Sequence, residues 1–299
     1  MLPTVDFCFK ELMQNPKVRQ GFIAALLNVE PETVSETTLM PTILSQESVD
    51  DKVGILDVRV KMSDGTQVDL EMQVARYDYW ENRVIFCLSR MYSSQIKRGA
   101  SYEVLKKCIH VSILDFNYFR NDERCYRTVA FCDIETGELY SDLMEIQILE
   151  LPKLPHDMPE NSDEISVYEW MKFFGGKRRE DFEDMARTNE YIGEAYDTLM
   201  ELSADERKRL EYEAREKALL DYNSNMKGSY DRGHAAGFEE GLKEAKQETD
   251  RIKKEVHDRE VNVFVSLLKR GFSVQEARDI TNSGDDIVQE AVTADISIY

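Results

Sequence analysis

Apolar and polar residues alternate through the segment "GILDVRVKMSDGTQVDLEMQV", residues 54–74. A period of two residues is typical of a strand with one buried face. The interruption "SDGT" contains an Asp-Gly pair, which is a strong turn signal between two such runs. The segment therefore predicts a β-hairpin.

The positions of the apolar residues restrict the register of this hairpin. They are even-numbered on both runs: 56–62 on the first and 68–74 on the second. Cross-strand partners share a face of the sheet, so the numbers of two paired residues must sum to an even value. A two-residue Asp64-Gly65 turn would break this parity. We therefore expect a loop with an odd number of residues, with Gly65 at or near a positive φ. Asp57 then faces Glu71 or Gln73, and the other of the two is diagonal to it.

Helical spacing of apolar residues appears at the start of the chain and again after the hairpin. The first segment predicts two short helices that end near "NVEPE", and "TLMPTILSQES" is interpreted as an edge strand before the hairpin. Residues 78–98 are expected to form a helix, with Asp78 and Glu81 at capping-box spacing and Gly99 at its end.

Three further strands are expected over residues 108–114, 126–134 and 143–151, with "ETGE" as the turn between the last two. The order is helices, hairpin, helix and then strands. A strand–helix–strand crossover implies a parallel pair. The pattern therefore predicts an α/β core with a mixed central sheet flanked by helices.

The composition changes after "LPKLPHDMPEN", and we expect three parts: a core over 1–155, a helical extension over 156–225, and a charged helical arm with a small helical element over 226–299. Charges of both signs fill the arm, which is typical of a coiled-coil-like or dimerising helix. The alternative interpretation is a solvent-exposed spacer. We expect a homodimer or a higher homo-oligomer formed through these C-terminal helices.

The net charge of −20 argues against nucleic acid, because cationic side chains supply most of the affinity for a duplex. The charge is uneven, however. Residues 76–107 hold seven basic and three acidic residues. Arg83, Arg90 and Lys97 recur every seven residues, nearly two helical turns, and are expected to form one cationic stripe. Beside a metal site this stripe would contact phosphates, and a solvated helix face is the alternative.

The five cysteines are odd in number, lack C-x-x-C spacing and lie mostly in apolar runs, so we interpret them as reduced thiols. Reduced thiols point to the cytoplasm. The start "MLPTVDFCFKELM" has no signal-peptide core, and no apolar run approaches membrane-spanning length.

The polar face of the hairpin offers candidate chemistry. Asp57, Glu71 and Gln73 are expected to converge at one end of it, within reach of a single metal ion. Mg²⁺ prefers oxygen ligands and typically binds one or two carboxylates, with substrate phosphate completing its shell. Asp57 and Glu71 would be those ligands, and Gln73 would orient a water molecule or a phosphate oxygen. Polar residues on an exposed hairpin face are more commonly solvated, so the pattern alone does not establish a site.

Three blocks, "LPTVDFCFKELM", "GILDVRVKMSDGTQVDLEMQVARY" and "RMYSSQIKRGASYEVLKKCIHVSIL", resemble the Rpn-like recombination-promoting nuclease or putative transposase family of the PD-(D/E)XK nuclease superfamily. The resemblance covers about the first half of the chain. It implies a restriction-endonuclease-like core, a Mg²⁺- or Mn²⁺-dependent DNA endonuclease activity, and catalytic roles for Asp57, Glu71 and Gln73.

The family's amino-terminal D-x-x-F-K element corresponds to Asp6, Phe9 and Lys10, and implies a helix alongside the site. The chain departs from the superfamily motif at Gln73, where a lysine is usual. A lysine would stabilise the charge of the transition state, whereas glutamine only forms hydrogen bonds. Lys10 or Lys61 is expected to supply the missing charge, and the sequence does not decide between them.

The function expected from these patterns is metal-dependent hydrolysis of DNA phosphodiester bonds, in recombination or in the processing of mobile-element or phage-related DNA. Two alternatives stay open: a catalytically idle nuclease fold that binds a protein partner, and a nuclease directed at RNA.

Overall fold

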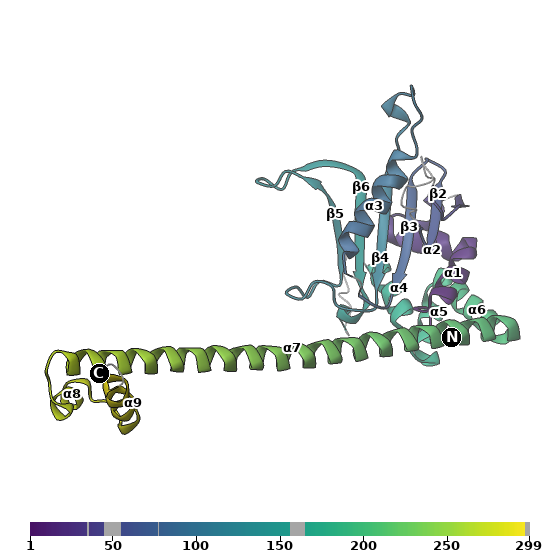
Figure 1. Ribbon diagram of the computed structural model, residues 1–299. Coiled ribbons are helices and arrows are strands. Elements are labelled where there is room, and N and C mark those ends of the chain that lie inside the picture. The colour runs from purple at the N-terminus through teal and green to yellow at the C-terminus, as the bar shows by residue number, and fades with distance from the viewer. Residues whose placement is uncertain (35, 45–54, 77, 156–164, 297–299) are drawn as a thin grey trace. The chain divides into compact units, whose positions relative to one another are not determined.

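The computed structural model of the chain describes residues 1–34, 36–44, 55–76, 78–155 and 165–296 (Figure 1). It contains two compact units, Met1–Asn223 and Ser224–Tyr299, which are described separately below. Within the described ranges, no helix combines the length and the apolar character needed to cross a membrane.

The first unit is built on a six-stranded sheet with the strand order β1-β2-β3-β4-β6-β5. Its strands are β1 (Thr37–Met40), β2 (Val58–Met62), β3 (Gln67–Gln73), β4 (Cys108–Leu114), β5 (Tyr126–Cys132) and β6 (Leu139–Glu150). Strands β3, β4 and β6 run parallel, whereas β1, β2 and β5 pair antiparallel with their neighbours. The expected mixed sheet is confirmed, and so is β1 as an edge strand, although residues 45–48 of the quoted segment lie outside the described ranges.

The β2–β3 hairpin has the predicted register parity. Val58 pairs with Leu70, and Val60 pairs with Val68. The N–H of Met62 donates to the carbonyl of Thr66 over 2.8 Å, which leaves the three residues 63–65 as the loop. Gly65 has φ +92°, where a side chain would be strained. The expected odd-length loop is therefore confirmed.

Two short helices precede the sheet, as predicted: α1 (Asp6–Gln14) and α2 (Pro16–Leu27). Asn15 caps α2, because its side chain accepts hydrogen bonds from the N–H groups of Lys17 and Val18. Pro16 at the first helical position has no N–H that would need a partner.

The crossover helix α3 (Trp80–Ser93) connects β3 to β4, but it is shorter than the predicted 78–98. Tyr79 rather than Asp78 is the N-cap residue, with a left-handed φ of 62° and no side-chain cap. At the other end, Gln95 forms two hydrogen bonds with the backbone of Lys106. These long-range contacts replace further helical turns. Gly99 has a positive φ of 85°, but it lies in a later turn and does not terminate the helix.

The later strands differ from the prediction mainly at their ends. Strand β4 has the expected bounds, β5 ends two residues early at Cys132, and β6 begins four residues early at Leu139. The turn between them contains Gly137, whose φ is +73°. Near this turn β5 and β6 pair irregularly, with register shifts after Val129.

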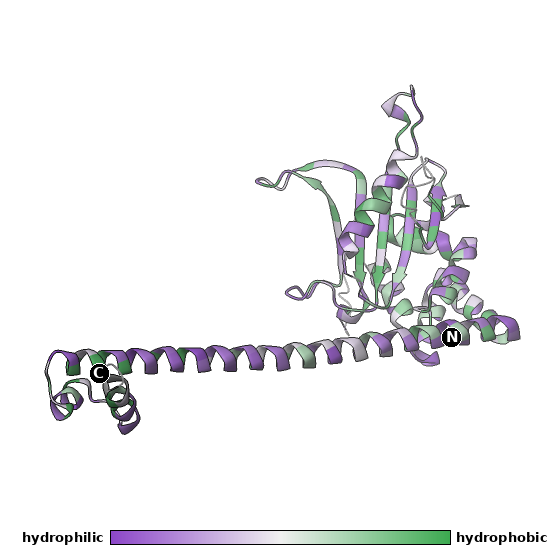
Figure 2. Ribbon diagram, viewed as in Figure 1, coloured by the Kyte–Doolittle hydropathy of each residue, from purple (hydrophilic) through white to green (hydrophobic). Residues whose placement is uncertain are grey.

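One face of the sheet is covered by α1, α2 and the helices after it: α4 (Ile165–Gly175), α5 (Arg179–Thr188) and α6 (Glu190–Ala204). Their largest side chains form an aromatic cluster in which Phe22 contacts both Trp170 and Phe174, with ring centroids 5.4 and 5.0 Å away. Figure 2 shows apolar residues concentrated in the sheet and the helices packed on it. The expected boundary near residue 155 therefore does not divide this hydrophobic core, since residues from both sides of it contribute.

Helix α3 covers the opposite face. Its buried residues Val84, Cys87 and Leu88 contact strand residues such as Cys108 and Leu114. All five cysteines are free, and Cys132 is the exposed one. Burial raises the pKa of Cys108 to about 12, which keeps it in the thiol form.

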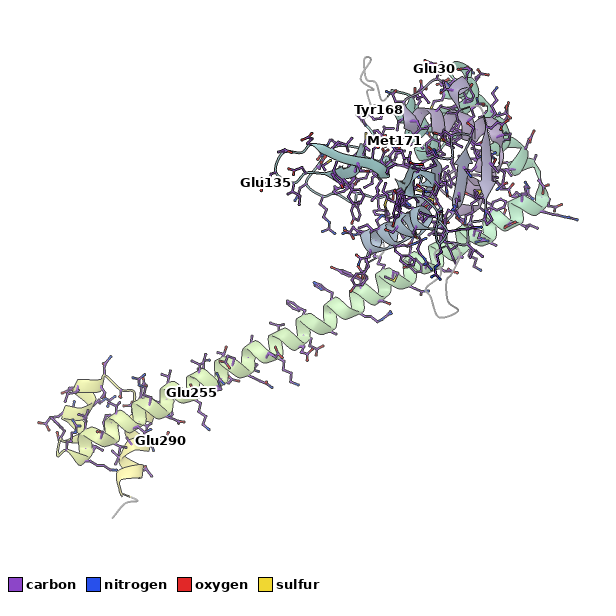
Figure 3. All side chains as sticks on the ribbon, turned by 90° about the horizontal axis from the view of Figure 1, so that it is seen from above. Glu30, Glu135, Tyr168, Met171, Glu255 and Glu290 are labelled. Carbon is purple, nitrogen blue, oxygen red and sulfur yellow. The ribbon has the colours of Figure 1, made fainter. Side chains whose placement is uncertain are left out.

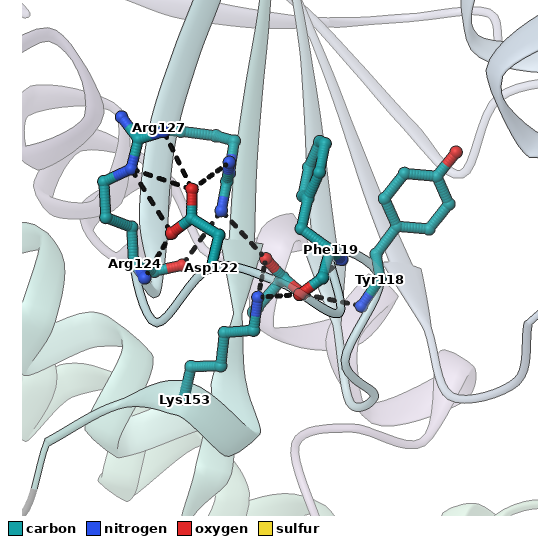
Figure 4. Close-up of polar contacts among 7 residues, drawn as sticks. Tyr118, Phe119, Asp122, Arg124, Arg127 and Lys153 are labelled. Carbon is teal, nitrogen blue, oxygen red and sulfur yellow. Dashed lines mark hydrogen bonds and ion pairs between the residues drawn. The ribbon is translucent and has the colours of Figure 1, made fainter.

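A buried carboxylate fixes the loop that follows β4 (Figure 4). Glu150, the last residue of β6, is fully buried and accepts hydrogen bonds from the N–H groups of Tyr118 and Phe119, over 2.6 and 3.1 Å. Its other oxygen lies 2.9 Å from Lys153 Nζ and 3.4 Å from Arg127. A buried charge needs such compensation, and here it ties the loop to the carboxyl ends of the parallel strands.

The second unit begins within α7 (Glu206–Lys269) and continues through α8 (Val274–Thr281) and α9 (Asp285–Ile296). Helix α7 runs without a break through the glycines at 228, 233, 237 and 241. Phe264 of α7 packs with Ala277 of α8 and Ile287 of α9 to form a small core. The small helical element expected after the charged arm corresponds to α8 and α9, packed on the end of α7.

Candidate active site

Asp57 and Glu71 lie at the same end of the β2–β3 hairpin. Asp57 immediately precedes β2, and the register of this pair, extended by one residue beyond Val58 and Leu70, brings Asp57 opposite Glu71. Both belong to the odd-numbered set of the hairpin, whose even-numbered residues pack on α1 and α2. Glu71 is 1% exposed, and the side chain of Asp57 is 17% exposed.

Burial raises the pKa of both carboxyl groups. For Asp57, loss of hydration is the largest cause and the charge of Lys10 partly opposes it. The pKa of Glu71 rises to about 7, first through burial and also through the negative charges of Asp69 and Asp57, while His110 and Arg83 oppose the rise. This end of the hairpin is therefore a place where additional positive charge would be stabilised.

Helix α1 brings a lysine to Asp57. Lys10 Nζ lies 3.2 Å from Asp57 and 2.8 Å from Asp6 one turn earlier on the helix. Burial alone would lower the pKa of Lys10, but the hydrogen bond to Asp6 and the charge of Asp57 raise it above its usual value. The ammonium thus stays charged beside the candidate site. Lys61 is exposed at the turn end of the hairpin, where its register partner is Gln67.

Helix α3 brings an arginine to Glu71. One guanidinium nitrogen of Arg83 forms an ion pair with Glu71 Oε1, and the guanidinium also lies 5.6 Å from the centre of the Trp80 ring. The side chain of Arg83 is 42% exposed, so it connects the buried carboxylate with the surface. Each of the two candidate metal ligands is therefore paired with a cationic side chain: Asp57 with Lys10, and Glu71 with Arg83.

Asp69, His110 and Ser112 form a buried hydrogen-bonded chain next to Glu71. The Nδ1–H of His110 donates to Asp69 Oδ2 over 2.7 Å, and its Nε2 lies 3.0 Å from Ser112 Oγ and 3.7 Å from Glu71 Oε2. Burial would lower the pKa of His110, but Asp69 and Glu71 raise it, which favours the imidazolium. Ser112 is fully buried, so it does not reach a substrate; the chain instead orients His110 toward Glu71.

Sequence reasoning missed Asp69 and His110 as members of this site. His110 lies in the apolar run "CIHVSIL", and no pattern of metal-ligand spacing marks it. The parallel register of β3 and β4 pairs Asp69 with His110 and Glu71 with Ser112. The one available signal was that Asp69 has the same parity as Glu71 on the predicted strand.

Gln73 is the last residue of β3 and is half-buried. Its carbonyl accepts a hydrogen bond from the N–H of Asp115 over 2.8 Å, which joins the ends of β3 and β4. Its side-chain amide forms no hydrogen bond with another residue of the described ranges. The amide is therefore available to a ligand.

The expected cationic stripe is only partly formed. Arg83 and Arg90 lie on α3, two turns apart, but the helix ends at Ser93, so Lys97 follows in an irregular segment and is not on the same helix face. Arg90 is half-buried, with its guanidinium 6.0 Å from the centre of the Phe86 ring. Lys97 is exposed.

Oxygen and nitrogen donors suited to a cation are concentrated here. In the part of the chain that the structure describes, Asp69, Glu71 and His110 offer ligand atoms that all lie within 4.8 Å of one another. Asp69 Oδ1 is buried and has no hydrogen-bond partner among the described residues. Carboxylate oxygens are the ligands that Mg²⁺ and Mn²⁺ prefer.

Comparison with known proteins identifies the family. The family model described as "PD-(D/E)XK nuclease family transposase" matches residues 3–229. The match confirms the resemblance inferred from the three sequence blocks and extends it over the helices that complete the core of the first unit. No curated protein and no solved structure gives a significant match.

Proposed function

Because this chain belongs to the PD-(D/E)XK nuclease family transposases, a family with a restriction-endonuclease-like α/β fold, we propose that it is a divalent-metal-dependent endonuclease that hydrolyses phosphodiester bonds of DNA. The observation that carries the proposal is the position of Asp57 and Glu71. These two carboxylates lie at one end of a hairpin, both with a pKa raised by burial and each beside a cation.

The residues fit a Mg²⁺ or Mn²⁺ ion. Two partly desolvated carboxylates that repel each other lose that repulsion when they share a dication. Asp57 and Glu71 would hold the ion. The alternative group of Asp69, Glu71 and His110 is less suitable, because both nitrogens of His110 already have partners and all three residues are 1% exposed, whereas the preferred pair includes Asp57, whose side chain is 17% exposed. A bound ion would supply Lewis acidity and lower the pKa of a water molecule.

The other residues of the site have roles that follow from their positions. Gln73 is neutral at a position where the superfamily motif usually has a lysine. Lys10, next to Asp57, would provide this missing positive charge and would stabilise negative charge on the attacked phosphate. Gln73 would orient the attacking water or a phosphate oxygen through its unengaged amide. Asp6 holds Lys10, and the Asp69–His110 pair holds Glu71.

Arg83, Arg90 and Lys97 would contact the DNA backbone. Arg83 is half exposed and ion-paired with Glu71, and Lys97 is exposed beyond the end of α3. Their charge is local, in a chain whose net charge is −20. Affinity for DNA should therefore be modest and should fall steeply with salt. The reduced thiols fit a cytoplasmic protein.

Nicking of a supercoiled plasmid tests the proposal. The wild-type protein should nick DNA with Mg²⁺ or Mn²⁺ but not with EDTA, and Asp57→Asn and Glu71→Gln should each lower the rate by about a thousandfold. Lys61→Gln, at the opposite end of the hairpin, is the matched control and should keep full activity. Cleavage of RNA but not of DNA would show that the substrate is RNA and not DNA. A wild-type protein that is folded, binds no Mn²⁺ and cleaves neither would indicate an idle nuclease fold.

A further inference from the structure

Helix α7 carries a second apolar face within the C-terminal unit. Between residues 235 and 263 of this helix, five large apolar side chains are 47–66% exposed: Phe238, Leu242, Ile252, Val256 and Val263. Figure 3 shows side chains projecting from α7 around Glu255. Exposed apolar residues scattered singly need no explanation, but a regular series on one helix indicates a contact surface.

The five residues follow a heptad repeat. With position a at residues 235, 242, 249, 256 and 263, position d falls at 238, 245, 252 and 259. Every one of the five is then at a or d, and the remaining core positions hold Ala235, Ala245, Thr249 and Arg259. A repeat of 3.5 residues is the signature of a helix that packs along another helix.

The helices of the same unit cover a different face of α7. Val261 and Phe264, which pack on α8 and α9, fall at positions f and b of the same repeat. These positions are on the side of the helix opposite to a and d. The a/d face therefore stays uncovered by α8 and α9, and the residues that build the local core do not compete for it.

The charges beside this face select a second copy of the chain in parallel orientation. In a parallel pair, position g of one helix meets position e of the next heptad on the other. Glu248 at g then meets Lys253 at e, and this attractive contact occurs twice by symmetry. In the antiparallel pairing centred on the same segment, Lys246 meets Lys253 and Glu248 meets Glu255, so like charges repel.

Arg259 is the unfavourable member of the repeat. A parallel pair brings two arginines together at this d position. By the same rule Glu255 at g meets Glu260 at e of the other helix, and the positive charge of the two Arg259 side chains between them offsets the repulsion of these like charges. A single charged core residue lowers the stability of a coiled coil but fixes its register. We infer that residues 235–263 form a parallel two-stranded coiled coil with a second copy of this chain.

Sedimentation equilibrium of the full-length protein tests the inference. The wild type should show a concentration-dependent mass approaching twice that of one chain. The double variant Ile252→Glu, Val256→Glu should weaken the association by about a hundredfold or more. Gln247→Glu with Lys254→Glu, at two f positions, is the control and should associate like the wild type. A wild type of single-chain mass at its highest soluble concentration, or an undiminished dimer of the double variant, overturns the inference.

Disulfide cross-linking tests the orientation separately. In a Cys132→Ser background, Leu242→Cys should form an intermolecular disulfide on mild oxidation, because a parallel register places the two 242 positions opposite each other. Glu244→Cys, at an outward c position, should not. An associated protein that does not cross-link through position 242, or that cross-links equally through 244, contradicts the parallel pairing. Neither experiment depends on nuclease activity, so the result is independent of the proposed function.

Discussion

Arg83 of α3 is ion-paired with Glu71 of β3, and this contact joins a half-exposed guanidinium to a carboxylate that is 1% exposed. His110 lies on the other oxygen of Glu71, but it is enclosed and hydrogen-bonded at both ring nitrogens. Of these two partners of Glu71, Arg83 is therefore the one that can move away when another cation arrives.

Replacement of Arg83 should have opposite effects on metal and on DNA. Arg83→Gln removes a competitor for Glu71, so we expect the affinity for Mn²⁺ without DNA to rise by about fivefold. The same change removes a phosphate contact, so the KM for DNA should rise as well. Arg83→Lys keeps the charge and should lie closer to the wild type on both measures. Electron paramagnetic resonance of free Mn²⁺ gives the first quantity, and steady-state plasmid cleavage gives the second.

A suitable control is Arg187→Gln, which removes the same charge from an exposed ion pair with Asp184 on α5. Its affinity for Mn²⁺ should not change. If Arg83→Gln binds Mn²⁺ more weakly than the wild type, Arg83 supports the geometry of Glu71 rather than competing for it.

Lys10 and Lys61, the two candidates for the missing positive charge, lie near opposite ends of the hairpin. Lys10→Ala should lower kcat by about a hundredfold, because it removes the cation 3.2 Å from Asp57. Lys61→Ala should leave kcat unchanged, since Lys61 lies at the turn end of the hairpin. Lys10→Arg should recover part of the loss. Equal rates for Lys10→Ala and the wild type, with the fold intact by circular dichroism, would remove Lys10 from the mechanism.

The β2–β3 hairpin shows which features of the structure can be predicted from the sequence alone. The parity of its register followed from strand alternation, because only one parity buries the even-numbered residues such as Val58 and Leu70. That parity left Asp57 opposite either Glu71 or Gln73, and the register of the structure selects Glu71. The odd length of the loop and the positive φ of Gly65 required no information from the rest of the chain.

Features that depend on distant contacts were not predictable in this way. His110 joins the site only because β3 and β4 run parallel in a register that pairs it with Asp69, 41 residues earlier. The end of α3 depends on hydrogen bonds between Gln95 and Lys106. Local propensity does not encode such contacts, and this is why Lys97 was expected on a helix that had already ended.

The Glu150 network should matter for stability. Glu150→Gln leaves Lys153 and Arg127 without their buried counter-charge, and we expect a loss of about 2–4 kcal/mol in the free energy of unfolding. Urea denaturation followed by circular dichroism measures this loss. Asp122→Asn, which removes a more exposed partner of Arg127, should cost much less. Equal losses for the two variants would show that burial of Glu150 is not the deciding factor.

Stability of the C-terminal unit should depend on pH through His257. Its Nε2 lies 2.8 Å from Glu290 of α9, the residue marked in Figure 3. That hydrogen bond, together with the charges of Glu290, Asp286 and Asp258, raises the pKa of His257 above its usual value. A raised pKa means that the folded unit holds the proton more tightly than the unfolded chain does. The contribution is therefore complete below the ordinary histidine pKa and is lost as the pH rises through the raised value.

Hydrogen exchange of the α9 amides, corrected for intrinsic rates, should detect this effect in the full-length protein. Below the ordinary histidine pKa, His257→Gln should exchange faster than the wild type, and well above the raised value the two should converge. His234→Gln is the matched control, since His234 stacks on Tyr230 and precedes His257 on α7 by more than six helical turns. A difference between His257→Gln and the wild type that is the same at both pH values would mean that packing, and not the charged hydrogen bond, connects α7 to α9.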